Sequence, residues 1–191
     1  MKRAPALLSI GLLATALTQA LLAADGTLPL GKDGKPLNFD FETGTLQDWS
    51  VEGDACDGQP IRGDKVATRR TDMKSAHAGE YWYGTFEVGG DKPQGKLKSV
   101  PFRVTQPFAA FLVGGGSQEG TRVELVRQDT KEVFFQISGE DTENMRPVVV
   151  DLSKLVGKNM FIRVIDSVSG GWGHINFDDF KFYAARQKFS N

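Results

Sequence analysis

Few residues of this chain are of the types that form or break covalent bonds. Nucleophilic catalysis needs a serine or cysteine activated by a histidine base. The sequence contains two histidines, His77 and His174, and no G-x-S-x-G elbow surrounds any serine. Glycoside hydrolysis needs two carboxylates across a cleft, but the acidic residues at 140–143 lie in a polar turn between two expected strands. The residue types therefore favour binding over catalysis.

Acidic side chains near both ends of the expected domain are candidates for a cation site. Glu42 lies in a flexible turn, and Asp178 and Asp179 lie in the last expected strand. Calcium takes six to eight hard oxygen ligands, typically carboxylates and loop carbonyls. If the first and last strands are neighbours, Glu42 and an aspartate would converge on one calcium ion. The alternative is that Glu42 only caps a turn and the aspartates are solvated.

Aromatic side chains are candidate sugar platforms, because the apolar face of a pyranose packs against a ring. Tyr81, Trp82 and Tyr83 share one expected strand, on which Trp82 faces opposite to the two tyrosines. We expect one side of this strand to be core and the other exposed. Trp172 lies in a glycine-rich loop that ends at His174, where it either plugs the sandwich or contacts ligand. The candidate ligand contacts are Tyr81, Tyr83, Trp172 and His174.

The elements that must position these residues are short strands. From residue 37 onward, apolar residues follow a period of two between turn signals, and no long helix is indicated. Nine strands are expected, at residues 37–41, 79–87, 96–102, 108–113, 122–126, 132–137, 147–152, 160–165 and 173–183. The fifth and sixth form a hairpin, and the first and last are expected to be neighbours. With 22 glycines in the chain, this pattern predicts an all-β sandwich or barrel.

The last expected strand contains a break in its alternation. Ile175 and Phe177 share one face, whereas Phe180 and Phe182 have the opposite parity. One strand can bury all four only if an extra residue is accommodated between the pairs. We therefore predict a β-bulge at residues 178–179, which would turn one carboxylate toward a neighbouring loop.

The buried residues follow from the same alternation. The expected core consists of Phe39, Phe41, Phe111, Val113, Val123, Leu125, Phe135, Val149, Ile162, Val164, Ile175 and Phe177. Trp49 is expected to join them. Cys56 is the one cysteine of the chain, so no intramolecular disulfide forms. We expect its thiol to be buried as a small hydrophobe, the alternative being intermolecular pairing.

The N-terminus is typical of a secretory signal. Lys2 and Arg3 precede a largely apolar run at residues 4–22, and small residues follow before residue 25. The alternative is a retained membrane anchor, although the run is at the short end of the roughly 20 residues that a span needs. We expect residues 1–24 to be a signal peptide and the protein to be secreted or periplasmic, with no membrane span after cleavage.

Length and charge bound the rest of the chain. We expect residues 25–36 to be a linker, 37–185 one sandwich domain and 186–191 a tail. The chain has 23 basic and 24 acidic residues; without the two basic residues of the signal segment, 21 remain and the net charge is −3. This balance gives no electrostatic reason to expect nucleic acid as a partner.

The sequence contains four blocks, at residues 38–49, 77–82, 111–116 and 170–178, which in this order resemble galactose-binding-like carbohydrate-binding modules. Residues 38–49 resemble the F-E-x-G-x-x-x-x-W opening of these modules, and residues 77–82 look like their H-x-G-x-Y turn into a strand. Residues 111–116 and 170–178 are similar to blocks in modules appended to levanase-type β-fructosidases. The resemblance covers residues 37–183. It implies an antiparallel two-sheet jelly-roll sandwich.

The resemblance also implies a metal site. In such modules a structural calcium ion joins the opening glutamate to an aspartate of the last strand, which here implicates Glu42 and Asp178 or Asp179. The sugar-binding residues of these modules lie in variable loops, and no motif here matches them. The levanase-type catalytic domain has no counterpart in this sequence, so no hydrolase activity is implied.

The sequence therefore predicts an exported, non-catalytic binding module with a glycan or polysaccharide as its partner and a structural calcium ion. Two other functions stay open. One is a structural or adhesion module that binds protein partners, which a large exposed apolar patch would favour. The other is an unrecognised hydrolase, which a cleft with facing carboxylates would favour.

Overall fold

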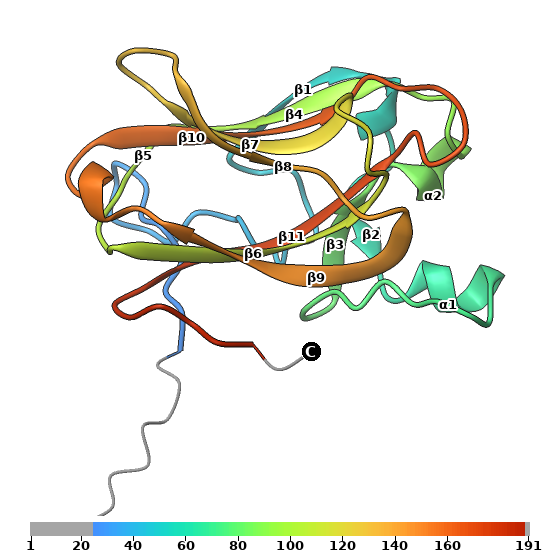
Figure 1. Ribbon diagram of the computed structural model, residues 1–191, viewed down its shortest axis with the longest axis horizontal. Coiled ribbons are helices and arrows are strands. Elements are labelled where there is room, and N and C mark those ends of the chain that lie inside the picture. The colour runs from blue at the N-terminus through green and yellow to red at the C-terminus, as the bar shows by residue number, and fades with distance from the viewer. Residues whose placement is uncertain (1–24, 190–191) are drawn as a thin grey trace, which may run out of the picture.

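The computed structural model describes residues 25–189, so the expected signal segment at residues 1–24 lies outside the described residues. Two antiparallel sheets pack face to face (Figure 1), which confirms the predicted all-β sandwich. The helices of the described region are a few residues long, again as expected. None of them is long and apolar enough to cross a membrane.

The first sheet has six strands and the second has five. The order in the first is β1 (Trp49–Gly53), β4 (Gly95–Ser99), β10 (Asn159–Asp166), β7 (Thr121–Arg127) and β8 (Val133–Ile137), with β5 (Phe102–Arg103) paired to β10. The order in the second is β2 (Ile61–Arg62), β3 (Tyr81–Gly84), β11 (Ile175–Tyr183), β6 (Phe108–Gly115) and β9 (Thr142–Asp151). The predicted β7–β8 hairpin is confirmed.

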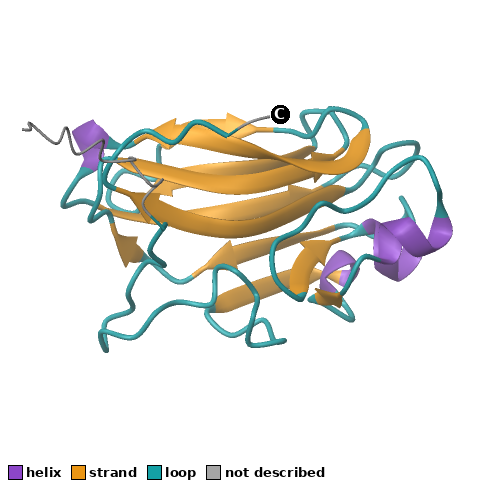
Figure 2. Ribbon diagram, turned by 90° about the horizontal axis from the view of Figure 1, so that it is seen from below, coloured by secondary structure: helices purple, strands orange, loops and turns teal. Residues whose placement is uncertain are grey.

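Short helical segments join the strands. They are α1 (Lys65–Arg69), α2 (Phe86–Gly89) and the 3₁₀ turns η1 (Asp54–Cys56) and η2 (Ser153–Leu155). Both α-helices lie at one end of the sandwich (Figures 1 and 2). Residues 85–87 were expected to continue a strand, but β3 ends at Gly84 and the chain turns into α2.

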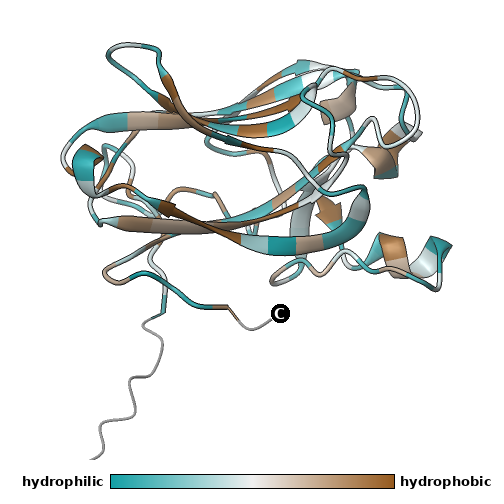
Figure 3. Cartoon of the chain, viewed as in Figure 1, coloured by the Kyte–Doolittle hydropathy of each residue, from teal (hydrophilic) through white to brown (hydrophobic). Residues whose placement is uncertain are grey.

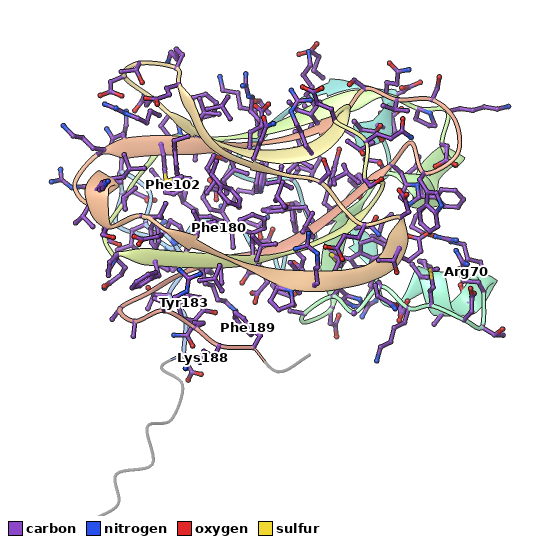
Figure 4. The ribbon with its side chains drawn as sticks, in the orientation of Figure 1. Arg70, Phe102, Phe180, Tyr183, Lys188 and Phe189 are labelled. Carbon is purple, nitrogen blue, oxygen red and sulfur yellow. The ribbon has the colours of Figure 1, made fainter. Side chains whose placement is uncertain are left out.

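The core between the sheets is rich in phenylalanine. Phe102 and Phe180 face each other there (Figure 4), with ring centroids 5.6 Å apart, and Phe39 packs on Phe102 at 5.1 Å. Along the strands, apolar and polar residues alternate (Figure 3). Ten of the twelve expected core residues are buried. The exceptions are Phe135, on edge strand β8, and Val149, which faces outward because its neighbours on β9 face inward.

The expected first strand is wrong, although its apolar residues are placed correctly. Leu37, Phe39 and Phe41 are all buried, yet Phe41 has a φ of 57°, which an extended strand does not allow. The segment still lies beside β11, because the Phe39 carbonyl accepts a hydrogen bond from the Phe180 amide at 3.1 Å. The first true strand is β1, which belongs to the opposite sheet from β11.

The predicted β-bulge is confirmed. The pairing between β11 and β6 shifts between Asp178 and Lys181, and Asp179 has a φ of 55°. The shift lets Phe177 and Phe180 both enter the core. Residues 25–36, expected as a linker, are held to the same strand, because Thr27 exchanges two backbone hydrogen bonds with Phe182.

Both sides of β3 are buried, in contrast to the expected exposed side. Tyr83 joins the main core, whereas Trp82 packs in a second, smaller cluster with Ile61, Val66 and Met145. The Trp82 indole donates a hydrogen bond to the Gly63 carbonyl at 2.9 Å. Helix α1, through Val66, therefore covers the face of β3 that alternation would leave to solvent, and β2 extends the sheet beside it.

Candidate functional site

A pocket of about 230 Å³ lies at the end of the sandwich that carries the two α-helices. The loop between β10 and β11 forms one wall. The residues that line it are Arg69, Arg70, Phe86, Asp91, Glu143, Gly171, Trp172 and His174. Two of the four expected ligand contacts, Trp172 and His174, are thus brought together.

His174 is buried between two carboxylates at the base of the pocket. Its Nδ1 atom is 2.6 Å from Asp91 Oδ1, and its Nε2 atom is 3.4 Å from Glu143 Oε2. Burial alone would lower the pKa of His174, but the adjacent carboxylates of Glu143 and Asp91 raise it above its usual value. The rings of Phe86 and Trp172 pack on the imidazole, with centroids 5.0 Å and 5.4 Å away. His174 thus forms the base of the pocket and contacts its carboxylates and its aromatic rings.

Glu143 is the most deeply placed charge of the pocket, with a side chain 1% exposed. It forms an ion pair with Arg69 and accepts a hydrogen bond from Asn176 Nδ2 at 3.0 Å. Burial raises the pKa of Glu143, but His174, Arg69 and Asn176 outweigh this and lower it to about 2. Glu143 is therefore a fixed anion that orders the cations around it.

The arginines at the rim are held by several partners. Arg69 also pairs with Glu87 at 2.8 Å, and its guanidinium lies 4.2 Å from the centroid of the Phe86 ring. Arg70 pairs with Asp72 at 2.7 Å. Arg69 therefore presents hydrogen-bond donors at the pocket mouth with little freedom to move away, whereas Arg70 is held by a single exposed carboxylate.

Trp172 is presented by a loop whose backbone is fixed by hydrogen bonds. The Gly170 amide donates to the Asp91 carbonyl at 3.1 Å, and Gln118 Nε2 donates to the Gly171 carbonyl at 3.1 Å. A Cβ at Gly116 would collide with the Trp172 carbonyl. Trp172 itself has a φ of 61°, a left-handed conformation that costs about 1–3 kcal/mol for a non-glycine residue. The half-buried indole is thus held in place at the rim.

The two tyrosines of the expected ligand set lie elsewhere. Tyr83 is 1% exposed, with its hydroxyl 3.3 Å from the thiol of Cys56, so no ligand reaches it. Burial raises the pKa of both groups, and Cys56 is buried as predicted. Tyr81 is half-buried at the far end of β3 from the pocket, packed near Gly44 with the Arg62 guanidinium 5.9 Å from its ring centroid.

Sequence reasoning missed the charged residues of the pocket. Glu143 was assigned to a solvated turn, but β9 begins at residue 142 and places this side chain inside. Asp91 follows Gly90, the residue after α2, and Arg69 is the last residue of α1; neither lies in a recognisable motif. Only proximity in the fold joins them to His174. The glycines around Trp172 were the one local signal.

The expected calcium ligands meet at one loop. Glu42 accepts hydrogen bonds from the Glu80 and Tyr81 amides, both at 2.9 Å, and Asp178 Oδ2 accepts one from the Ala78 amide at 2.8 Å. Asp178 Oδ1 is buried and has no hydrogen-bond partner. Burial, with the charges of Asp179 and Glu42 adding to it, raises the pKa of Asp178 to about 9.

The third expected ligand points elsewhere. Asp179 pairs with Lys181 at 2.6 Å, so the bulge separates the two aspartates. Within residues 25–189, no group of three or more His, Cys, Asp or Glu side chains is gathered as a metal site would require. A cation here would need backbone oxygens beside Glu42 and Asp178, which is a usual ligand set for calcium.

Comparisons with known proteins identify the fold. No family model matches the chain. The structure of TmCBM61 in complex with β-1,4-galactotriose is similar with a TM-score of 0.50 and 18% identity, over 75% of this chain and 93% of that one. The chain shares the fold of this carbohydrate-binding module. The K2 cleaved adhesin domain of Lys-gingipain has a TM-score of 0.47 and 18% identity, over 75% and 96% of the two chains.

One curated relative is a much longer protein. It comes from Aspergillus rugulosus, is named for a glycosyl hydrolase, ecdE, and is 31% identical over 138 residues. The match covers 72% of this chain but 19% of the relative. The chain thus spans about a fifth of that protein. The resemblance to levanase-appended modules stays a prediction.

Proposed function

We propose that this chain is a non-catalytic module that binds a glycan in the Trp172 pocket. The observation that carries the proposal is the indole of Trp172, fixed half-buried at the rim of a pocket that it lines together with Phe86 and several polar side chains. A sugar offers an apolar C–H face for such a ring and hydroxyls for the polar groups around it.

The polar groups of the pocket complement sugar hydroxyls in both directions. Arg69 and Arg70 donate hydrogen bonds, and the carboxylate of Asp91 accepts them. Asp91 is held by His174, and Arg69 by Glu143 and Glu87, so their positions are set before ligand arrives. Such pre-organisation lowers the entropy that binding costs.

The carboxylates of the pocket favour binding over hydrolysis. A glycosidase needs a carboxylic acid that keeps its proton near neutral pH. Glu143 is buried and its pKa is lowered to about 2, so it is ionised and has no proton to donate. Asp91 is engaged with His174. The fold shared with TmCBM61, which is described with β-1,4-galactotriose, adds support for a neutral galactoside as ligand.

The test is calorimetric titration of β-1,4-galactotriose, followed by a panel of neutral oligosaccharides, into the purified chain. We expect Trp172→Ala to weaken binding about tenfold or more, since aromatic platforms carry a large share of such energies. Phe189→Ala removes an exposed aromatic from the C-terminal segment and should change nothing. Equal affinity of Trp172→Ala and the unchanged chain, or release of reducing ends from the glycan, would overturn the proposal.

We also propose that Glu42 and Asp178 hold a structural calcium ion with nearby backbone oxygens. The support is the buried, unpartnered Asp178 Oδ1 and the loop at residues 78–81 that binds both carboxylates. A bound cation would stabilise the ionised form of the buried Asp178 beside Glu42 and tie β11 to the residues before β1.

Export completes the proposed function. It rests on the N-terminal pattern of the sequence, and sequencing the N-terminus of the secreted protein would test it. A mature protein that begins close to residue 25 is the expected result, and one that retains the apolar run would contradict it.

A further inference from the structure

The outer face of the six-stranded sheet carries two adjoining hollows of about 470 and 480 Å³. Ser50 and Lys98 line both of them, so the hollows form one continuous depression across β1, β4, β10 and β7. No helix of the described region covers this face (Figure 1). The depression is separate from the Trp172 pocket, with which it shares no lining residue.

Basic side chains run across this depression in register. Lys98 pairs with Ser50 on one side and with Arg163 on the other, and Arg163 is opposite Glu124. Because neighbouring strands lie about 4.8 Å apart, this row spans roughly 14 Å. The next outward row places Lys96 beside Glu52 and ends at Arg122.

Two arginines of the depression are fixed by one buried carboxylate. Glu124 is 2% exposed; its Oε1 accepts from Arg122 Nε and its Oε2 from Arg163 Nε, both at 2.7 Å. One anion thus orients two guanidinium groups, which leaves a local charge of +1 and unused N–H donors. Such oriented guanidiniums bind carboxylate and sulfate oxygens well.

Two lysines of the depression have no anionic partner. The Lys98 and Lys131 ammonium groups lie 4.8 Å and 5.7 Å from the centroid of the Phe161 ring. Neither forms an ion pair with any residue between 25 and 189, whereas Lys96 pairs with Glu52 at 3.1 Å. Cation–π interactions with the Phe161 ring hold both ammonium groups close to the same side chain. A chain of net charge −1 therefore concentrates uncompensated positive charge on this face.

From this geometry we infer that the depression is a second binding site, for an acidic polysaccharide that carries carboxylate or sulfate groups. The cationic pairs are spaced across the sheet, with Glu52 and Asp48 at the edges of the hollows. Such spacing suits a polymer with well-separated charges. A DNA duplex carries one phosphate per about 3.4 Å of each strand, and a charge this dense would bring phosphates against Asp48 and Glu52 as well as against the cations.

The test compares polygalacturonate and a sulfated galactan with neutral β-1,4-galactan by biolayer interferometry. The variant is the double reversal Lys98→Glu and Lys131→Glu. Its matched control is Lys32→Glu with Lys154→Glu, which makes the same change of net charge at exposed lysines elsewhere. We expect the first pair to lose acidic-polymer affinity about tenfold or more and the control pair to keep it, because like charges at a contact are strongly unfavourable.

Binding to either acidic polymer supports the inference, and the stronger one identifies the anion. Binding should also weaken steeply with salt, since screening lengths fall to about 3 Å at 1 M. If the double reversal does not fold, Lys98→Ala with Lys131→Ala and the salt titration replace it. Three results would overturn the inference. The variant pair and the control pair lose the same affinity, neither acidic polymer binds, or single-stranded DNA binds more tightly than either polymer. Trp172→Ala leaves this site intact, so the two proposals fail separately.

Discussion

At the scale of single residues, His174 makes stability depend on pH. Its pKa in the folded protein is raised above the ordinary 6.5, so its contribution is complete below about pH 6.5 and is lost as pH rises through the folded value. Glu143 has its pKa lowered from 4.5 to about 2, so its contribution is present above about pH 4.5 and is lost as pH falls toward 2. Both contribute fully between about pH 4.5 and 6.5.

We therefore expect His174→Gln to lower the melting temperature most at about pH 5.5 and much less above pH 8. Glu143, Asp91 and Asp166 face the imidazole; because His174 acts on the pKa of Glu143 and on that of Asp166, which burial raises to about 6, the difference between the two melts reports His174 together with these carboxylates. His77→Gln is the control, because burial lowers the pKa of His77 and its effect should have the opposite pH trend. A difference for His174→Gln that grows with pH would contradict the expectation.

Single residues also show where sequence reasoning reached the site. The glycines around Trp172 are a local signal that an aromatic side chain is presented by a tight loop. Glu143 gave no such signal, because burial of a glutamate depends on Arg69 and His174, which reach it from α1 and from the start of β11. Buried charge networks are assembled by tertiary contacts, and their members look like solvated residues in sequence.

At the scale of elements, the β11 bulge was predictable from the sequence, and the conformation of the opening segment at residues 37–41 was not. The parity of four buried residues requires the bulge at residues 178–179, whatever the neighbouring strands are. Leu37, Phe39 and Phe41 alternate like a strand, but the left-handed backbone of Phe41 turns the chain away from a ladder. Edge strand β1 went unrecognised because its polar, exposed residues show little apolar alternation.

The bulge and the opening segment together support the calcium prediction. Chelator should lower the melting temperature, because an ion that binds only the folded state stabilises it by about 2.7 kcal/mol at a hundredfold excess over Kd. Glu42→Gln should remove this sensitivity. Asp179→Asn should keep it, since Asp179 pairs with Lys181. Identical melting temperatures with and without chelator would rule the site out. If Asp179→Asn abolished the sensitivity to chelator, Asp179 would be a calcium ligand.

At the scale of the whole molecule, the sandwich presents two separate surfaces that we propose bind saccharides. The all-β architecture followed from strand spacing and turn residues alone, because a chain of short alternating strands has few other ways to bury its apolar faces. Which loops meet at the end of the sandwich, and which basic side chains align across the outer sheet, depends on strand order, and strand order is not encoded in local pattern. The sequence indicated Trp172 and His174, whereas the charged residues around them and the whole basic depression emerged only from the fold.

The two surfaces are joined by one short stretch of chain. Ser167 lines the basic depression at the end of β10, and the loop that follows presents Trp172. A polysaccharide with both neutral and acidic stretches could therefore occupy both sites at once, and linked binding events gain affinity through effective concentration. This prediction rests on both proposals. We expect a long, partly acidic galactan to bind at least about tenfold more tightly than either a neutral or an acidic oligosaccharide of a few units.

The variants separate such linked binding from two independent sites. We expect Trp172→Ala to remove most of the extra affinity for the long polymer, and we expect the same of the Lys98→Glu with Lys131→Glu pair. Combining these changes should cause little further loss, because either one already breaks the linkage between the sites. For short oligosaccharides, each variant should affect its own ligand alone. If the losses of affinity for the long polymer are additive, the Trp172 pocket and the depression bind separate polysaccharide chains. The short connection between Ser167 and Trp172 would then have no role in recognition.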